Sequence, residues 1–137
     1  MFKRLVVLVP ALALAVSVFA YPTVGKDPNN VQPNFWTSQL AAARTRAGQL
    51  GLPMLVMCVD TVTCGNCKKW DDGVLKNAAW PVFLAQYPMM LVMLDRSSLS
   101  STSWSTLTQP YRGAGGSLDF PTAAVHAPSG VKLGQFD

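Results

Sequence analysis

Two continuous apolar runs, residues 54–60 and 89–94, are the clearest pattern along the chain, and each has the length of one strand. Neither run alternates apolar with polar positions, which is typical of strands that are covered on both faces. Between them lies a segment compatible with a helix to about Leu75, followed by a second helical piece from about Asn77 with Pro81 in its first turn. This order predicts two parallel strands joined by a right-handed helical crossover.

The segments before and after this unit carry weaker patterns. Apolar residues recur on one face of a stretch that has Asn34 or Thr37 as its cap and ends at Gly51, which predicts a helix. Residues 97–108 are rich in serine and threonine, and they predict a surface loop with at most one weak helical turn.

The end of the chain predicts a β-hairpin. Residues 123–126 and 131–136 have the composition of strands, and Pro128 followed by Gly130 supplies turn chemistry between them. The predicted fold class is therefore α/β, with a mixed central sheet flanked by helices in a single small domain.

The first twenty residues predict a signal peptide. Lys3 and Arg4 precede a continuous apolar stretch, and the small side chains of Val18 and Ala20 fit cleavage before Tyr21. The stretch is short for a membrane span of roughly 20 residues, and an uncleaved anchor is the alternative interpretation.

Export changes the interpretation of the cysteines, because disulfides persist in oxidising compartments. We expect a periplasmic or extracellular protein that makes no stable membrane insertion after signal cleavage. Residues 1–20 are then the signal peptide, residues 21–33 an extended leader without core residues, and residues 34–137 the folded domain.

Charge indicates no nucleic-acid partner. The chain carries 11 lysine and arginine residues against seven acidic residues, for a formal charge of +4. Removal of Lys3 and Arg4 with the signal peptide leaves about +2. The basic residues are scattered, without the arginine-rich stripe that nucleic-acid binding requires.

Candidate chemistry lies in Cys64-Gly65-Asn66-Cys67. Two thiols separated by two residues can form a disulfide and exchange it with another protein. The order of the flanking segments puts Cys64 at the first turn of a helix, where unpaired N–H groups and the helix dipole favour a thiolate. We expect Cys64 to be the nucleophile and Cys67 to be more sheltered.

Several separated segments together resemble the thioredoxin superfamily, in particular exported thioredoxin-like proteins with a CGNC active-site motif. They are Phe35-Trp36, residues 52–56, residues 63–70 around the cysteines, and Phe120-Pro121-Thr122. The resemblance covers roughly residues 34–136. It implies a thioredoxin-like fold whose final helix is missing, since the chain stops at Asp137.

The resemblance also implies an activity and roles for individual residues. The implied enzyme is a protein thiol-disulfide oxidoreductase in which Cys64 attacks a substrate disulfide and Cys67 resolves the mixed disulfide. Pro121 is implied to be cis, and with Phe120 it is implied to bind an extended substrate. No cofactor beyond the dithiol is implied.

This chain departs from the better-known thioredoxin pattern at several positions. Thr63 and Asn66 stand where the family often has tryptophan and proline. Cys58 stands where many thioredoxins bury an aspartate that helps to move a proton from the resolving thiol. Asp60, two residues further along the predicted strand, is a candidate substitute.

Other interpretations of the cysteines remain open. The pair could be a local staple, although so short a loop contributes little stability. A metal site would need about four ligands, and only the three cysteines and His126 are available, so none is predicted. Haem attachment is excluded because Lys68 follows the second cysteine. Lys68 could assist the Cys64 thiolate, and Trp70 could line the site or pack in the core.

The predicted partners are exported proteins with cysteines or disulfides, together with a redox partner protein. The direction of disulfide transfer is not predicted. The alternative function is a thioredoxin-like module that binds an extended peptide beside Pro121 while Cys64 and Cys67 stay permanently bridged.

Overall fold

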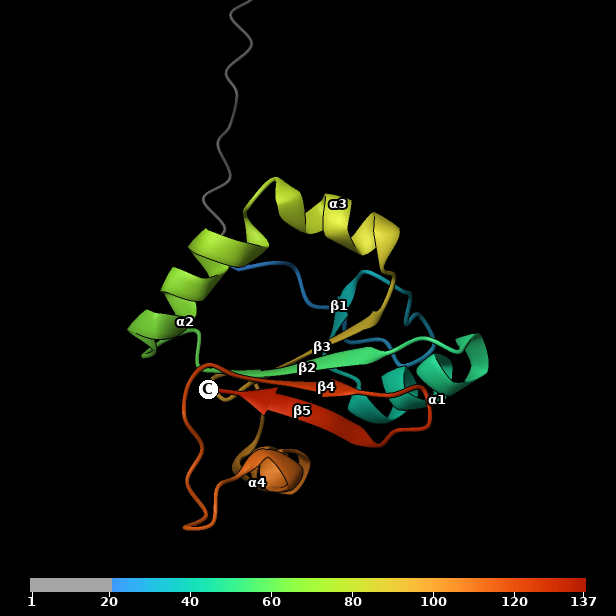
Figure 1. Ribbon diagram of the computed structural model, residues 1–137. Helices are drawn as coiled ribbons and strands as arrows, with labels where there is room; N and C mark the ends of the chain where they lie inside the picture. Colours follow the sequence, from blue (N-terminus) through green and yellow to red (C-terminus); the bar gives the residue numbers. More distant parts are fainter. Residues whose placement is uncertain (1–20) are drawn as a thin grey trace, which may run out of the picture.

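The computed structural model describes residues 21–137, which build a five-stranded sheet in the order β1-β3-β2-β4-β5 (Figure 1). The strands are β1 (Trp36–Thr37), β2 (Met54–Val59), β3 (Met90–Asp95), β4 (Thr122–His126) and β5 (Lys132–Phe136). β3 runs parallel to both β1 and β2, whereas β4 runs antiparallel to β2 and to β5. This arrangement confirms the predicted mixed sheet, its parallel pair and its terminal hairpin.

Helices cover both faces of the sheet. They are α1 (Leu40–Leu50), α2 (Gly65–Trp70), the π-helical turn η1 (Asp71–Leu75), α3 (Ala79–Gln86), α4 (Ser101–Thr108) and the short 3-10 turn η2 (Gln109–Tyr111). Figure 1 shows α2 and α3 above the sheet and α4 below it, with α1 at the far end of β2. The two layers are therefore formed by segments that alternate along the chain.

The side chains of β2 alternate between two separate hydrophobic layers. Met57 and Val59 pack with Cys67 of α2 in one layer, while Val56 and Cys58 pack in the layer of α1 and α4. All four strand residues are at most 1% exposed. Burial of each such side chain stabilises the fold by roughly 1.5 to 3 kcal/mol, and burial on both faces explains the continuous apolar run.

The prediction of a loop over residues 97–108 is wrong, because α4 occupies most of this segment. The hydroxyl oxygen of Ser100 accepts a hydrogen bond from the Ser103 N–H and caps the helix. Trp104 is only 8% exposed and packs in the core, and Thr108 is fully buried. One buried tryptophan thus stabilises a helix that serine and threonine propensities disfavour.

The first predicted helix begins later than expected, at Leu40 rather than near Asn34. Asn34 adopts a positive φ of 66°, and its side-chain amide donates to the Leu84 carbonyl oxygen and accepts from the Met89 N–H. The chain then forms β1 beside β3. These long-range hydrogen bonds cannot be recognised from local sequence.

The expectation that residues 21–33 contribute no core is also wrong. Val31 is 6% exposed and belongs to the layer of α1, while Tyr21 and Val24 pack against the layer of α2. Gly25 forms a parallel bridge with Thr37. The predicted signal peptide, residues 1–20, lies outside the described residues.

Within residues 21–137, none of the helices combines the length and the apolar character required to cross a bilayer.

Buried polar residues in the α1 layer pair with one another. The His126 Nδ1–H donates to the Gly130 carbonyl oxygen at 2.9 Å, because a carbonyl can only accept. The Nε2 atom therefore accepts from the Tyr111 hydroxyl at 3.0 Å. Cys58 lies in this same layer and is fully buried, as predicted for a core residue.

Alkaline pH should destabilise the fold through Cys58. Burial raises the pKa of this thiol to about 12 from an ordinary value of 9.0, with a smaller opposing effect of Arg112. As the pH rises, the Cys58 thiol therefore ionises in the unfolded chain before it ionises in the folded protein. The stabilisation is complete below about pH 9 and is lost at about 1.4 kcal/mol per pH unit as the pH rises toward about 12.

Urea denaturation of the oxidised protein at about pH 8 and pH 10 measures this loss. The Cys58→Ala variant should be less stable at pH 8 but should show a shallower decline between the two pH values. An equal decline in both proteins would contradict the assignment.

Candidate active site

A disulfide joins Cys64 and Cys67 at the beginning of α2, with 5.2 Å between the Cα atoms. Cys64 is the N-cap residue and is partly buried, whereas Cys67 lies within the helix and is 1% exposed. The Cys67 N–H donates a hydrogen bond of 3.0 Å to the Cys64 sulfur. Cys64 is thus the sulfur that faces a helix N–H and remains within reach of solvent, and Cys67 is the sheltered one.

Two aspartates at the ends of neighbouring strands hold the loop that leads into the disulfide. One Asp60 carboxylate oxygen accepts the N–H groups of Val62 and Thr63 at 3.0 and 3.1 Å. Asp95 accepts both the N–H and the hydroxyl of Thr61, at 3.1 and 2.6 Å. The loop is therefore fixed to β2 and β3 at the same end of the sheet.

The electrostatics of these carboxylates agree with this structural role. Burial raises the pKa of Asp60, but hydrogen bonds from Thr63 and Val62 outweigh it and hold the pKa below its ordinary 3.8. For Asp95, burial is likewise outweighed by hydrogen bonds from Thr61 and Ser97. The sequence suggested Asp60 as a proton carrier but did not single out Asp95, whose signal was a charged residue at the end of a buried parallel strand.

Phe120 and Pro121 approach the disulfide from β4. Because Thr122 pairs with Cys58 near the end of β2, the preceding residues lie at the sheet end that carries the motif loop. The peptide bond between Phe120 and Pro121 is cis. Both residues line a groove of about 500 Å³ that also includes Asn66 of the motif.

The same groove has an apolar side that extends away from the motif. It is lined by Met57, Trp70, Val74 and Phe136, and by Lys69 and Asp137 at its polar positions. Phe136 is 65% exposed although it belongs to β5. Trp70 therefore both packs against the core layer of α2 and lines the groove beside Pro121.

Lys68 is paired with a neighbouring carboxylate. Its ammonium lies 2.9 Å from a carboxylate oxygen of Asp72, one helical turn along, and the two side chains are 58% and 47% exposed. An exposed pair of this kind contributes at most about 1 kcal/mol. Lys68 thus pairs with a carboxylate rather than with the Cys64 sulfur.

The four candidate metal ligands do not converge. Cys58 and His126 lie in the layer of α1 and α4, on the opposite face of the sheet from Cys67. Among residues 21–137, histidine, cysteine and aspartate side chains form no group of three that could hold a metal ion.

Comparison with known proteins gives matches in structure alone. No family model matches the chain, and no curated protein sequence matches it. A structure described as DsbH oxidoreductase superposes with a TM-score of 0.59 and 18% identity, covering 82% of this chain and 78% of that one.

Two further structures are similar to a comparable degree. A disulphide isomerase from Xylella fastidiosa Temecula1 gives a TM-score of 0.56 at 20% identity, covering 71% of this chain and 70% of that one. A thioredoxin from Thermus thermophilus gives 0.56 at 17% identity, covering 74% and 73%. The chain therefore has a thioredoxin-like fold, with a disulfide between the cysteines of a CxxC pair.

Removal of the Asp95 charge should loosen the motif loop. The Asp95→Asn variant keeps the shape but weakens the hydrogen bonds from Thr61 and Ser97, at a cost of about 1 to 2 kcal/mol in unfolding free energy at pH 7. The matched control is Asp119→Asn, which also removes one negative charge but does so at an exposed position.

The pH dependence of unfolding tests the same point. Because the folded pKa values of Asp60 and Asp95 are lowered, their contribution is present above about pH 4 and is lost as the pH falls below it. Urea midpoints of the wild type and Asp95→Asn should therefore converge progressively as the pH falls below about 4. If the difference between the two urea midpoints did not change with pH, the stabilisation by Asp95 would not come from its charge.

Proposed function

We propose that this protein is a thiol-disulfide oxidoreductase that exchanges disulfides with cysteines of exported proteins. The observation that carries the proposal is the asymmetry of the disulfide at the start of α2. Cys64 is partly exposed and receives an N–H hydrogen bond on its sulfur, whereas Cys67 is buried directly behind it. Exchange requires one accessible thiolate and one nearby thiol that is protected from competing reactions.

The chemistry proceeds in two exchange steps. The Cys64 thiolate attacks one sulfur of a substrate disulfide, so that a mixed disulfide forms and the other substrate sulfur leaves as a thiolate. Cys67 then attacks the Cys64 sulfur, forms the intramolecular disulfide and releases the second substrate sulfur. The substrate gains two electrons and the protein loses two. The same steps in reverse oxidise a substrate dithiol.

The Cys67 N–H supports the nucleophile. In the disulfide form this donor points at the Cys64 sulfur, and the same donor would stabilise the Cys64 thiolate of the reduced protein. The anchored loop from Asp60 to Thr63 keeps the sulfur in that position. Cys64 is therefore assigned as the attacking residue and Cys67 as the resolving residue.

Substrate binding is assigned to the groove beside the motif. Phe120 and Pro121 lie on it together with Asn66, so a polypeptide that presents a disulfide to Cys64 would contact this proline segment. The names of the similar structures, an oxidoreductase, a disulphide isomerase and a thioredoxin, agree with this use of the fold. The signal-peptide pattern of residues 1–20 supports export to the periplasm or the extracellular space, where a redox partner protein would regenerate the active form.

The activity test compares three proteins in the reduction of a protein disulfide with dithiothreitol as the electron source. The wild type should accelerate the reaction, and Cys64→Ser should abolish the acceleration. Cys67→Ser should instead accumulate a mixed disulfide with the substrate, visible as a mass increase that disappears on reduction. The matched control, Cys58→Ala, should retain the activity because Cys58 lies on the other face of the sheet.

Failure of the wild type to accelerate reduction would favour the alternative, a peptide-binding module with a permanent bridge, if its disulfide also resists reduction until the protein unfolds. The direction of transfer follows from the equilibrium potential of the pair in glutathione buffers. A value near about −270 mV indicates reduction of substrates, and one near about −120 mV indicates disulfide donation.

A further inference from the structure

Resolution by Cys67 requires a proton acceptor, because the thiolate attacks and the thiol does not. The sequence offered only Asp60 for this role, because Cys58 stands at the position of the family's aspartate. The Asp60 carboxylate holds the N–H groups of Val62 and Thr63. Cys58 faces the opposite layer from Cys67.

A different carboxylate lies on the face of the helix that carries Cys67. Asp71 follows Cys67 by four residues, and its N–H donates to the Cys67 carbonyl oxygen, so the helix is continuous between them. Residues four apart on a helix have Cβ atoms about 5 to 6 Å apart on one face. Cys67 is 1% exposed and Asp71 is fully buried, so bulk solvent reaches neither side chain.

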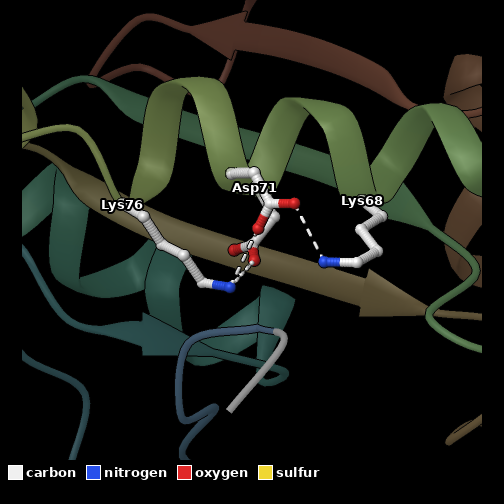
Figure 2. A network of polar contacts seen from close by, with 4 residues as sticks. Lys68, Asp71 and Lys76 are labelled. Carbon is white, nitrogen blue, oxygen red and sulfur yellow. Dashed lines mark hydrogen bonds and ion pairs between the residues drawn. The ribbon is translucent and has the colours of Figure 1, made fainter. Parts of the chain in front are cut away.

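The Asp71 carboxylate has one close polar contact within residues 21–137. The Lys76 ammonium lies 3.0 Å from Oδ2 but without the alignment of a hydrogen bond. Figure 2 marks this ion pair with a dashed line. Both carboxylate oxygens are buried and accept no hydrogen bond from the described residues. Buried carboxylates are normally saturated with donors, so Asp71 retains capacity to accept a proton.

A lysine ammonium lies beside this buried acid. The pKa of Lys76 is raised by its contact with Asp71 and then by its contact with Asp72, so the ammonium persists at neutral pH. Asp72 also binds Lys68 at 2.9 Å, and the two lysines and two aspartates form the network drawn in Figure 2. Asp71 thus lies beside a cation that is present at neutral pH.

Tyr21 and further aspartates lie near Asp71. Tyr21, from the N-terminal segment, packs against the layer of α2. Burial raises the pKa of its hydroxyl most, and the carboxylates of Asp71, Asp95, Asp72 and Asp60 raise it further, in that order. Asp71 is the member of this group that has the largest effect on Tyr21 and is itself fully buried.

We propose that Asp71 accepts the thiol proton of Cys67 when Cys67 attacks the mixed disulfide on Cys64. The inference rests on the proposed exchange activity. The proton passes from the Cys67 sulfur to the Asp71 carboxylate, directly or through one water molecule. The new Cys64–Cys67 bond then forms as the Cys64–substrate bond breaks, and the departing substrate thiolate is protonated from solvent. In the reverse direction the protonated Asp71 returns the proton to Cys67.

The test separates the two exchange steps with dithiobis(nitrobenzoate), an aromatic disulfide that releases a coloured thiolate at each step. One equivalent is mixed with the reduced full-length protein in a stopped-flow instrument. The first release reports attack by Cys64, and the second reports resolution by Cys67. Asp71→Asn should leave the first rate within about twofold and slow the second by about tenfold or more near pH 6.5. The deficit should shrink toward about pH 9, where the thiol ionises unaided.

The matched control is Asp72→Asn, which removes the same charge from the same network at an exposed position. It should leave both release rates within about twofold of wild type. Equal slowing of the second step in Asp71→Asn and Asp72→Asn would overturn the proposal in favour of a general charge effect, and an unchanged second rate in Asp71→Asn would overturn it outright. Absence of the first release in the wild type would instead overturn the proposed function.

A measurement on the wild type covers the case in which Asp71→Asn does not fold. Unassisted resolution slows tenfold for each pH unit below the thiol pKa of about 8.5, whereas assisted resolution stays nearly constant until the carboxylate is protonated. A nearly flat second rate between about pH 8 and pH 6 is expected. A tenfold fall per unit over this range would overturn the proposal.

Discussion

The pairing of β2 with both of its neighbours is the constraint on which the rest of the structure depends. Cys58, near the end of β2, pairs with Leu94 on one side and with Thr122 on the other. This double register brings three connections to one end of the sheet: the motif loop after β2, the Asp95 turn after β3 and the proline segment before β4. A slip of one residue in either register would separate these connections and reverse the faces of the strand side chains.

The elements whose signal is local could be predicted from the sequence. Unbroken apolar runs identified β2 and β3, and the spacing of Cys64 and Cys67 after such a run identified the start of a helix. The prediction failed where contacts between distant residues decide the conformation. Trp104 stabilises α4 by burial, and Asn34 forms hydrogen bonds with Leu84 and Met89 far along the chain. Neither contact produces a periodic pattern in the sequence.

The candidate site shows the same division. The disulfide pair and Pro121 could be identified from the chain, because a short motif and a resemblance are both visible there. The four-residue spacing of Asp71 after Cys67 is visible in the sequence, but the complete burial of Asp71 and its contact with Lys76 are not. A π-helical turn begins at Asp71, and such turns are frequent at functional sites.

Placement of Cys58 has a consequence for the maturation of the protein. The chain has three cysteines, so two of the three conceivable intramolecular disulfides would be non-native. Once the sheet has formed, Cys58 is separated from Cys64 and Cys67 by the thickness of the backbone layer, with α1 and α4 closing its other side. The sheet thus keeps the Cys58 thiol apart from the other two cysteines, so a folded molecule whose bridge has been reduced can re-form only the Cys64–Cys67 bridge.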